Sequence, residues 1–331
     1  MNKRATIKDV AALAETSASV VSYVLNETPG KSITTATKER VYAAAKKLNY
    51  VPNSAARALR TGSGKTIAFF AFWEKEDSSY NKFLAGLTHS AAKKGYNLLM
   101  CDTAQLTKTR LPLLLQQLNV SGIIVLSAGN PYFEYNNTKE SDIVGALSGL
   151  KIPSLIINGE GNYQNKGIDS LYFGFFEATY SATEYLISKG CKNIAYIKDD
   201  IPSISEADRL KGFLSALRKN GLSEHSVINV EEINTIFKNK LPDGVVTNKS
   251  DAGYLFLKAA AENKVKIPSK IKVIAANNEP FAEYLEPSLT TVSLPLSDLG
   301  KTAAYKIINK VENNNYSLPN LEYKVIQRKS V

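Results

Sequence analysis

The sequence has few of the residues that build metal, disulfide or nucleophilic sites. Its only two cysteines, Cys101 and Cys191, lie far apart and outside any metal-ligand spacing, so we expect both to be reduced thiols in the core. The only two histidines are equally isolated: His89 falls in a predicted helix and His225 in a predicted loop, and neither has a nucleophile near it in the sequence. These patterns predict a protein that is not an enzyme and holds no metal or cofactor.

Long hydrophobic runs are also absent. No stretch is long and apolar enough to span a bilayer, and residues 1–4 lead into a polar segment instead of an apolar signal region. We therefore expect a cytoplasmic protein without a membrane partner. The 331 residues are enough for a small module plus a large two-part domain.

The positive charge is concentrated near the N-terminus. Of the net charge of +10, residues 1–65 carry +7, from eleven Lys or Arg and four Asp or Glu, and the remainder carries +3, from 30 and 27. This distribution favours an N-terminal contact with nucleic acid and a nearly neutral body. A basic face that is merely solvated is the alternative explanation of the charge alone.

Two short helices are predicted at the N-terminus. Thr6 and Asp9 have the spacing of a capping box, and the first helix ends near Ala14 with one apolar stripe. Ser17 is the predicted N-cap of the second helix, which turns Val21, Val24 and Leu25 inward and Ala18, Ser19, Ser22 and Tyr23 outward. An outer face of small and polar residues suits close approach to base edges in the major groove.

A third helix and a short hinge follow. The third helix starts near Thr34 and is expected to bury Val41, Ala44, Ala45 and Leu48, which completes the plan of a helix-turn-helix module. A plain three-helix bundle explains these stripes equally well, but it does not explain the charge. Residues 51–53 interrupt the helical pattern. Residues 54–60 are helix-prone but too short to form a stable helix alone, so this segment needs DNA or a second copy of itself as a partner.

These motifs together resemble one known family. Thr6–Ala14, Val21-Ser22 with Val24–Asn26, and Leu48–Asn53 with Ala56–Leu59 resemble the LacI-type (LacI/GalR) bacterial transcription regulators, and the resemblance extends through nearly the whole chain. It implies that residues 54–60 form a hinge helix, in which Leu59 wedges into the minor groove beside its dimer mate and Arg57 contacts phosphate. It further implies base-reading roles for Ala18, Ser19 and Tyr23, and places Thr6, Ser17, Ser22, Asn26 and Thr34 near phosphates.

The sequence departs from the family at the predicted recognition helix. Tyr23 stands where members frequently have arginine, and tyrosine cannot make arginine's bidentate contact to guanine. Ala18 stands where a tyrosine or other large residue is common, and Val20 where threonine is common. We therefore assign no operator sequence by analogy.

Residues 62–66, Gly-Ser-Gly-Lys-Thr, look like the end of a P-loop. The full motif needs a glycine five residues before Gly64, where this chain has Leu59, and a P-loop lies between a strand and a helix. Here a helix-prone segment precedes the glycines and a strand-like run follows them. We interpret the segment as a flexible linker and not as a nucleotide site.

From Thr66 onward, apolar strand-like runs alternate with helical segments. This pattern predicts parallel sheets that are covered on both faces, in two Rossmann-like halves. Strands are predicted at 67–72, 97–101, 122–126, 154–157, 193–197, 244–247 and 272–275, and helices at 80–94, 176–188 and 206–220. We place a helix-turn-helix domain at 1–52, a hinge helix and linker at 53–65, and a core at 66–331, with one subdomain at about 66–160 plus 293–320 and the other at about 161–292 plus 321–331.

The core resembles the regulatory core of the same family, which is similar to periplasmic sugar-binding proteins; the matching stretches include residues 92–103, 190–195, 209–213 and 289–292. The resemblance places a small-molecule effector between the halves. Arg209 matches a family arginine that binds sugar hydroxyls, with an ion pair as the alternative role. Asn158, Asn248 and Asn277 lie where members commonly carry acids, which predicts a less acidic pocket. Tyr80 is expected either to stack on a sugar or to lie in the core, and Ser127 to contact the ligand from the end of a strand.

The combined interpretation is a homodimeric repressor that binds a near-palindromic DNA operator and is controlled by a small molecule, most simply a carbohydrate. The alternative is a DNA-binding regulator that answers to a protein partner, which the replaced pocket acids motivate. The last residues show no leucine heptads, which favours a dimer over a tetramer.

Overall fold

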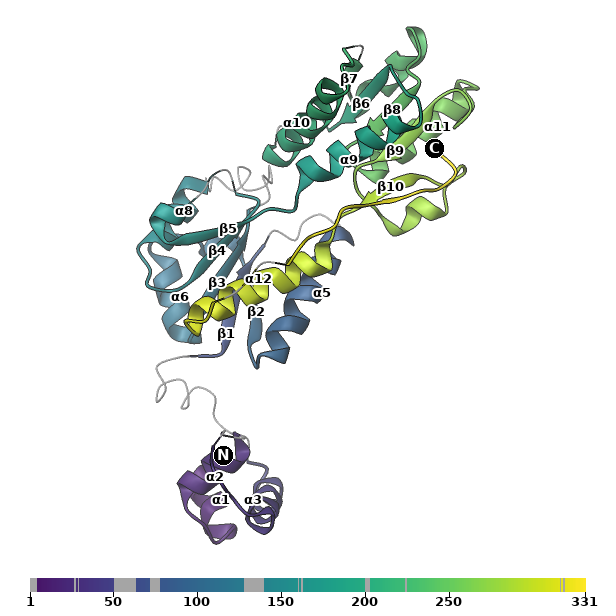
Figure 1. Cartoon of the computed structure of the whole chain (residues 1–331). Coiled ribbons are helices and arrows are strands. Elements are labelled where there is room, and N and C mark those ends of the chain that lie inside the picture. Colours follow the sequence, from purple (N-terminus) through teal and green to yellow (C-terminus); the bar gives the residue numbers. More distant parts are fainter. Residues whose placement is uncertain are drawn as a thin grey trace. The chain divides into compact units, whose positions relative to one another are not determined.

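The computed structural model describes residues 5–26, 28, 30–50, 64–71, 78–127, 140–159, 161, 163–199, 203–223, 225–315, 317 and 319–331. It divides into two compact units, Met1–Gly64 and Lys65–Val331 (Figure 1). The predicted hinge helix at 54–60 lies outside the described residues.

The N-terminal unit contains α1 (Ile7–Leu13), α2 (Ala18–Leu25) and α3 (Thr35–Lys47), which start where the sequence predicts. Each N-cap residue accepts a hydrogen bond from the backbone N–H three residues on, and the capping box of Thr6 and Asp9 is complete. Val10, Val21 and Val41 are fully buried at the centre of the three helices. Local capping and one small apolar cluster therefore define this unit.

The first sheet of the larger unit has the order β2-β1-β3-β4-β5, and all its pairs are parallel. Alternate residues of its strands face two separate clusters. Ile67 and Phe69 join α5 and α12 on one face, whereas Ala68 and Phe70 join α6 and α8 on the other. The elements are β1 (Thr66–Phe70), α5 (Ser78–Lys93), β2 (Asn97–Cys101), α6 (Arg110–Leu118), β3 (Gly122–Leu126), α8 (Glu140–Ser148), β4 (Ser154–Ile157), β5 (Ile168–Leu171) and α12 (Leu296–Val311).

The second sheet has the order β11-β10-β9-β8-β6-β7, with β11 antiparallel to β10 and the other pairs parallel. Helices α9 and α10 cover one face, and α11 with η3 cover the other. The elements are α9 (Phe175–Ser188), β6 (Ile194–Lys198), α10 (Ile204–Lys219), β7 (His225–Asn229), η3 (Val230–Lys238), β8 (Gly244–Thr247), α11 (Ser250–Glu262), β9 (Lys272–Ala275), β10 (Thr290–Ser293) and β11 (Lys324–Ile326); the remaining short 3-10 turns are η1 (Thr103–Gln105), η2 (Gln164–Lys166) and η4 (Pro280–Glu283).

The chain passes between the two sheets after β5, after β10 and before β11 (Figure 1). The predicted end of the first half at residue 160 is wrong, because Ile168–Leu171 pairs with β4 in the first sheet. The seven predicted strands are present, although Phe72 lies outside the described residues, and β5, β7, β10 and β11 were missed. His225 begins β7 and is not in a loop. Among the described residues, no helix is long and apolar enough to cross a membrane.

Candidate functional site

The exposed side of α2 carries the residues predicted to read bases. Ser19 is exposed, and Ala18 and Tyr23 are half-buried. The ammonium of Lys31 lies 5.1 Å from the centre of the Tyr23 ring, so a positive charge lies beside this residue of α2. Sequence reasoning missed Lys31, because no periodicity relates it to α2.

Ser22 does not face outward as predicted, since only 6% of it is exposed. The side-chain amide of Asn26 donates to the Ser22 carbonyl oxygen at 2.6 Å and to its hydroxyl at 3.3 Å. The two residues therefore close the end of α2, which supports a positioning role for Ser22. Thr6, Ser17 and Thr34 are exposed N-caps whose hydroxyls accept backbone N–H bonds. Arg57 and Leu59 lie outside the described residues.

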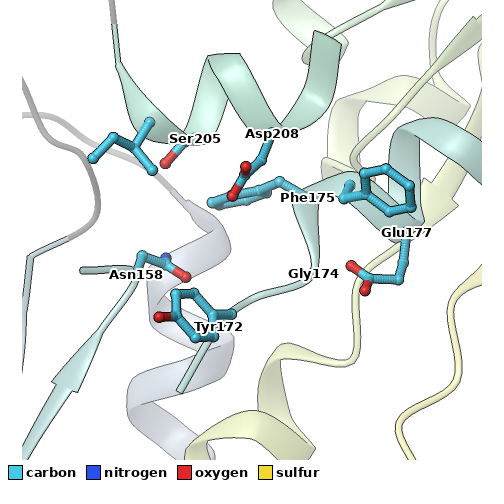
Figure 2. A pocket seen from close by; sticks show the side chains of 9 residues that line it. Asn158, Tyr172, Gly174, Phe175, Glu177, Ser205 and Asp208 are labelled. Carbon is cyan, nitrogen blue, oxygen red and sulfur yellow. The ribbon is translucent and has the colours of Figure 1, made fainter. Parts of the chain in front are cut away.

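A cavity of about 310 Å³ lies in the larger unit where strands of the first sheet end and helices of the second half begin. Figure 2 shows Ser205 and Asp208 on α10, across the cavity from Asn158 and Tyr172. Its remaining lining residues are Gly174, Phe175, Phe176 and Glu177 at the start of α9, and Ile204. Ligands of open parallel sheets bind at this edge, beyond the carboxyl ends of the strands.

Asn158 is positioned by the end of β4. Its φ of 54° is left-handed, a conformation that asparagine adopts more readily than most non-glycine residues. Its side-chain oxygen accepts the Phe173 N–H at 2.8 Å, whereas its side-chain nitrogen has no hydrogen-bond partner although Asn158 is only 5% exposed. This nitrogen is a buried donor at the wall of the cavity, and a bound ligand with an acceptor oxygen would satisfy it.

Comparison with known proteins finds a matching family for part of each unit. Residues 6–53 match the family described as bacterial regulatory proteins, lacI family, and residues 183–331 match the periplasmic binding protein-like domain. The chain belongs to the LacI/GalR family of bacterial regulators. It is accordingly a DNA-binding transcription regulator.

Individual relatives cover almost the whole of this LacI-family chain. It is 28% identical to the HTH-type transcriptional repressor PurR of Yersinia enterocolitica, over 99% of this chain and 97% of that protein. Its fold is similar to that of the lac repressor dimer bound to operator and the anti-inducer ONPF, with a TM-score of 0.77 at 21% identity over 99% of each chain. It is also similar to the transcriptional regulator CelR in complex with cellobiose, with a TM-score of 0.63 at 21% identity over 99% of this chain and 100% of that one.

Of the predicted effector residues of this LacI-family chain, only Asn158 lines the cavity. Arg209 is 4% exposed and stacks on Phe175, with its guanidinium carbon 4.2 Å from the ring centre, and it donates to the Ala276 carbonyl oxygen at 3.4 Å. Arg209 thus supports the wall of the cavity through Phe175. Tyr80 packs 6.2 Å from the Phe173 ring, and the Ser127 hydroxyl donates to Glu140.

Asn248 and Asn277 are turned into the protein. Asn248 is fully buried and its amide donates to Glu206 at 2.8 Å, while the Asn277 side-chain oxygen accepts the Ser250 N–H at 2.7 Å. Their amides therefore hold the ends of β8 and β9 in place.

A charged cluster accompanies Asn248. Burial works against ionisation of Asp199, but a hydrogen bond from Lys249 at 2.6 Å, the Lys249 charge and a hydrogen bond from Asn248 together lower the Asp199 pKa. Burial, followed by the charge of the hydrogen-bonded Glu206, raises the pKa of Tyr196 well above its usual value. The cluster therefore keeps the Asp199 carboxylate ionised and the Tyr196 phenol neutral.

The charge of this cavity comes from two residues outside the three asparagine positions. Glu177 and Asp208 both line it, and neither was singled out from the sequence. Acids on helices are usually solvated, so no sequence signal distinguishes these two. Among the described residues, no group of three or more His, Cys, Asp or Glu has the arrangement of a metal site.

Proposed function

We propose that this chain is a homodimeric repressor whose binding to a near-palindromic operator is controlled by a carbohydrate in the 310 Å³ cavity. The cavity carries the proposal. It combines the rings of Tyr172 and Phe175, which suit the apolar face of a sugar, with hydrogen-bonding groups of Asn158, Ser205 and Asp208. Its volume lies at the lower end of the range of about 300–1,000 Å³ for small-molecule sites.

Three comparisons support the parts of the proposal that the cavity does not address. The Yersinia relative is called a repressor, the lac repressor structure is a dimer on an operator, and the CelR structure holds cellobiose. The N-terminal unit supplies the DNA end, with Ala18, Ser19 and Tyr23 of α2 toward bases and Thr6, Ser17, Asn26 and Thr34 toward phosphates.

The position of the cavity links ligand binding to DNA binding. Asn158 and Tyr172 follow strands of the first sheet, whereas Ser205 and Asp208 lie on a helix that covers the second. A ligand that contacts both sets favours the arrangement of the halves in which both are within reach. A change in that arrangement would alter how two hinge segments, residues 54–60 of each subunit, fold on DNA.

DNase footprinting on the promoter beside the gene, with and without a panel of sugars, tests the proposal. We expect a protected near-palindrome whose occupancy one sugar changes. Absence of any protected palindrome under every condition would contradict the repressor. A thermal-shift screen tests the carbohydrate separately, because a bound ligand raises the melting temperature. A footprint that no sugar alters, with no thermal shift, would favour control by a protein partner.

The predicted hinge wedge is tested with Leu59→Ala. We expect weaker binding to specific operator, since a smaller side chain no longer wedges between base steps, with unchanged melting temperature and ligand binding. Fluorescence anisotropy with operator and with random DNA measures the ratio of the two affinities. An unchanged ratio would remove Leu59 from the interface.

A further inference from the structure

Among the described residues that line the cavity, the charges are all of one sign. Of the nine residues that line it, Glu177 and Asp208 are the only charged ones, and both are acids. Glu177 is an exposed residue in the first turn of α9, and Asp208 is a half-buried residue of α10. The cavity is therefore negative, which disfavours an anionic ligand and favours a cationic one.

The aromatic groups of the cavity add to this preference. Tyr172, Phe175 and Phe176 line it beside the two carboxylates. The electron-rich face of an aromatic ring attracts a cation, and Phe175 already carries the Arg209 guanidinium at 4.2 Å. Aromatic faces together with carboxylates form a surrounding that suits an ammonium group.

Asn158 provides an independent observation that a ligand belongs here. Its side chain is 95% buried, lines the cavity and leaves its nitrogen without a hydrogen-bond partner, because its oxygen is taken by the Phe173 N–H. The missing partner is an acceptor, such as a hydroxyl or ring oxygen. The occupant should thus present oxygen to Asn158 and positive charge to Glu177 and Asp208.

We propose that the effector of this cavity is an amino sugar, whose protonated amine lies against Glu177 and Asp208 and whose oxygen accepts a hydrogen bond from Asn158. This inference rests on the proposed function and specifies its ligand class. It follows from the two acids and not from the asparagines at 158, 248 and 277, which predict a less acidic pocket.

Two cations lie near the acids, and neither closes the cavity to a bound amine. Lys211 pairs with Asp208 at 3.2 Å, but the lysine side chain is 68% exposed, and such a pair contributes little, so a bound amine can replace it. Arg209 is buried against Phe175 and donates to a backbone carbonyl, so its donors do not face the carboxylates across the cavity.

Isothermal titration calorimetry on the full-length chain tests the inference with matched sugars. Glucosamine, galactosamine and mannosamine are each compared with the neutral parent hexose and with the N-acetyl derivative, which keep the ring and remove the charge. We expect at least one amino sugar to bind about tenfold or more tightly than both of its neutral partners, a ratio equal to about 1.4 kcal/mol. Putrescine serves as an amine without the polyol.

Charge-removing variants assign the preference to the cavity. Glu177→Gln and Asp208→Asn should each reduce the ratio of amino-sugar to hexose affinity about threefold or more, a loss typical of one partly exposed ion pair. Glu232→Gln, on exposed η3 away from the lining residues, should leave the ratio unchanged. Circular dichroism melts establish that each variant is folded.

The outcomes separate this inference from the function on which it rests. A neutral hexose that binds as tightly as its amino analogue would overturn the amino-sugar assignment and leave carbohydrate control intact. If putrescine binds as tightly as the amino sugar, the proposed recognition of the sugar oxygens is overturned. If none of these compounds binds, the amino-sugar assignment is overturned. A DNase footprint obtained with the same preparation would still support the DNA-binding function.

Discussion

The ammonium group of Lys31 lies 5.1 Å from the centre of the Tyr23 ring. Tyr23 is on α2, the predicted recognition helix, and Lys31 follows it in the connection to α3. Tyrosine alone cannot supply the charge that an arginine brings to the major groove, but the neighbouring lysine places a cation beside the same face. The pair thus combines an aromatic surface with a positive charge on the side of the module that is predicted to contact DNA.

Lys31→Gln should weaken binding to operator and to random DNA by similar factors. A lysine that neutralises one phosphate releases counterions, so its loss reduces the slope of log affinity against log salt by about 1. Anisotropy titrations at four salt concentrations measure the slope. Lys270→Gln, on an exposed connection of the larger unit, is the matched control. Equal slopes for both variants would place Lys31 outside the interface.

Thr6→Ala should destabilise the N-terminal unit by about 0.5–2 kcal/mol, because the mutation leaves the Asp9 N–H and the start of α1 without the hydroxyl of the capping box. Amide hydrogen exchange of α1 in the full chain reports the loss. Thr6→Ser retains the hydroxyl and should exchange at the wild-type rate. The capping role would be refuted by equal protection in Thr6→Ala.

Gly212→Ala should destabilise the larger unit by about 1–3 kcal/mol or more, since a Cβ there would overlap the Phe176 carbonyl oxygen and force α9 and α10 apart. Urea unfolding measures the free energy. Gly149→Ala is the matched control, because a Cβ at residue 149 meets nothing within 4 Å. Gly212→Ala should also weaken ligand binding, because Glu177 and Asp208 lie on the two helices that would separate.

Cys191 should resist alkylation in the folded chain while Cys101 reacts. Burial, followed by the charge of Asp243, raises the pKa of Cys191 to about 11, so little thiolate forms at pH 8. Burial also raises the pKa of Cys101, but that side chain is only partly covered. Mass spectrometry after timed iodoacetamide treatment measures both rates. Comparable rates in the native protein would contradict the burial of Cys191.

The same shift predicts a dependence of stability on pH. The folded state holds the Cys191 thiol neutral, so the stabilisation is complete below the ordinary thiol pKa of 9.0. As the pH rises from there toward 11, the unfolded chain ionises first and the free energy of unfolding falls. Cys191→Ala should flatten the profile from pH 9, whereas Tyr96 and Tyr323, whose pKa values are raised from 10.0 to about 12, add to the fall only from about pH 10 upward.

The sequence by itself determined the elements whose causes are local. The capping box of Thr6 and Asp9, the N-caps Ser17 and Thr34 and the buried strands at 122–126 and 244–247 each follow from a few adjacent residues. Strand β7 escaped prediction because it lies at a sheet edge with three of its five residues exposed, which leaves little apolar pattern. Strand β5 is short and only its two end residues are buried, so the boundary of the first half was placed too early.

Only the tertiary structure decided the chemistry of the cavity. Glu177 and Asp208 are ordinary helix acids in the sequence, and Asn248 and Asn277 look like better ligands. Close packing of α9 on α10, which Gly212 permits because it has no Cβ, brings the two acids to one cavity, while hydrogen bonds to Glu206 and Ser250 turn the two asparagines away. The sign of the charge that meets a ligand depends on this packing between segments, and no local pattern encodes it.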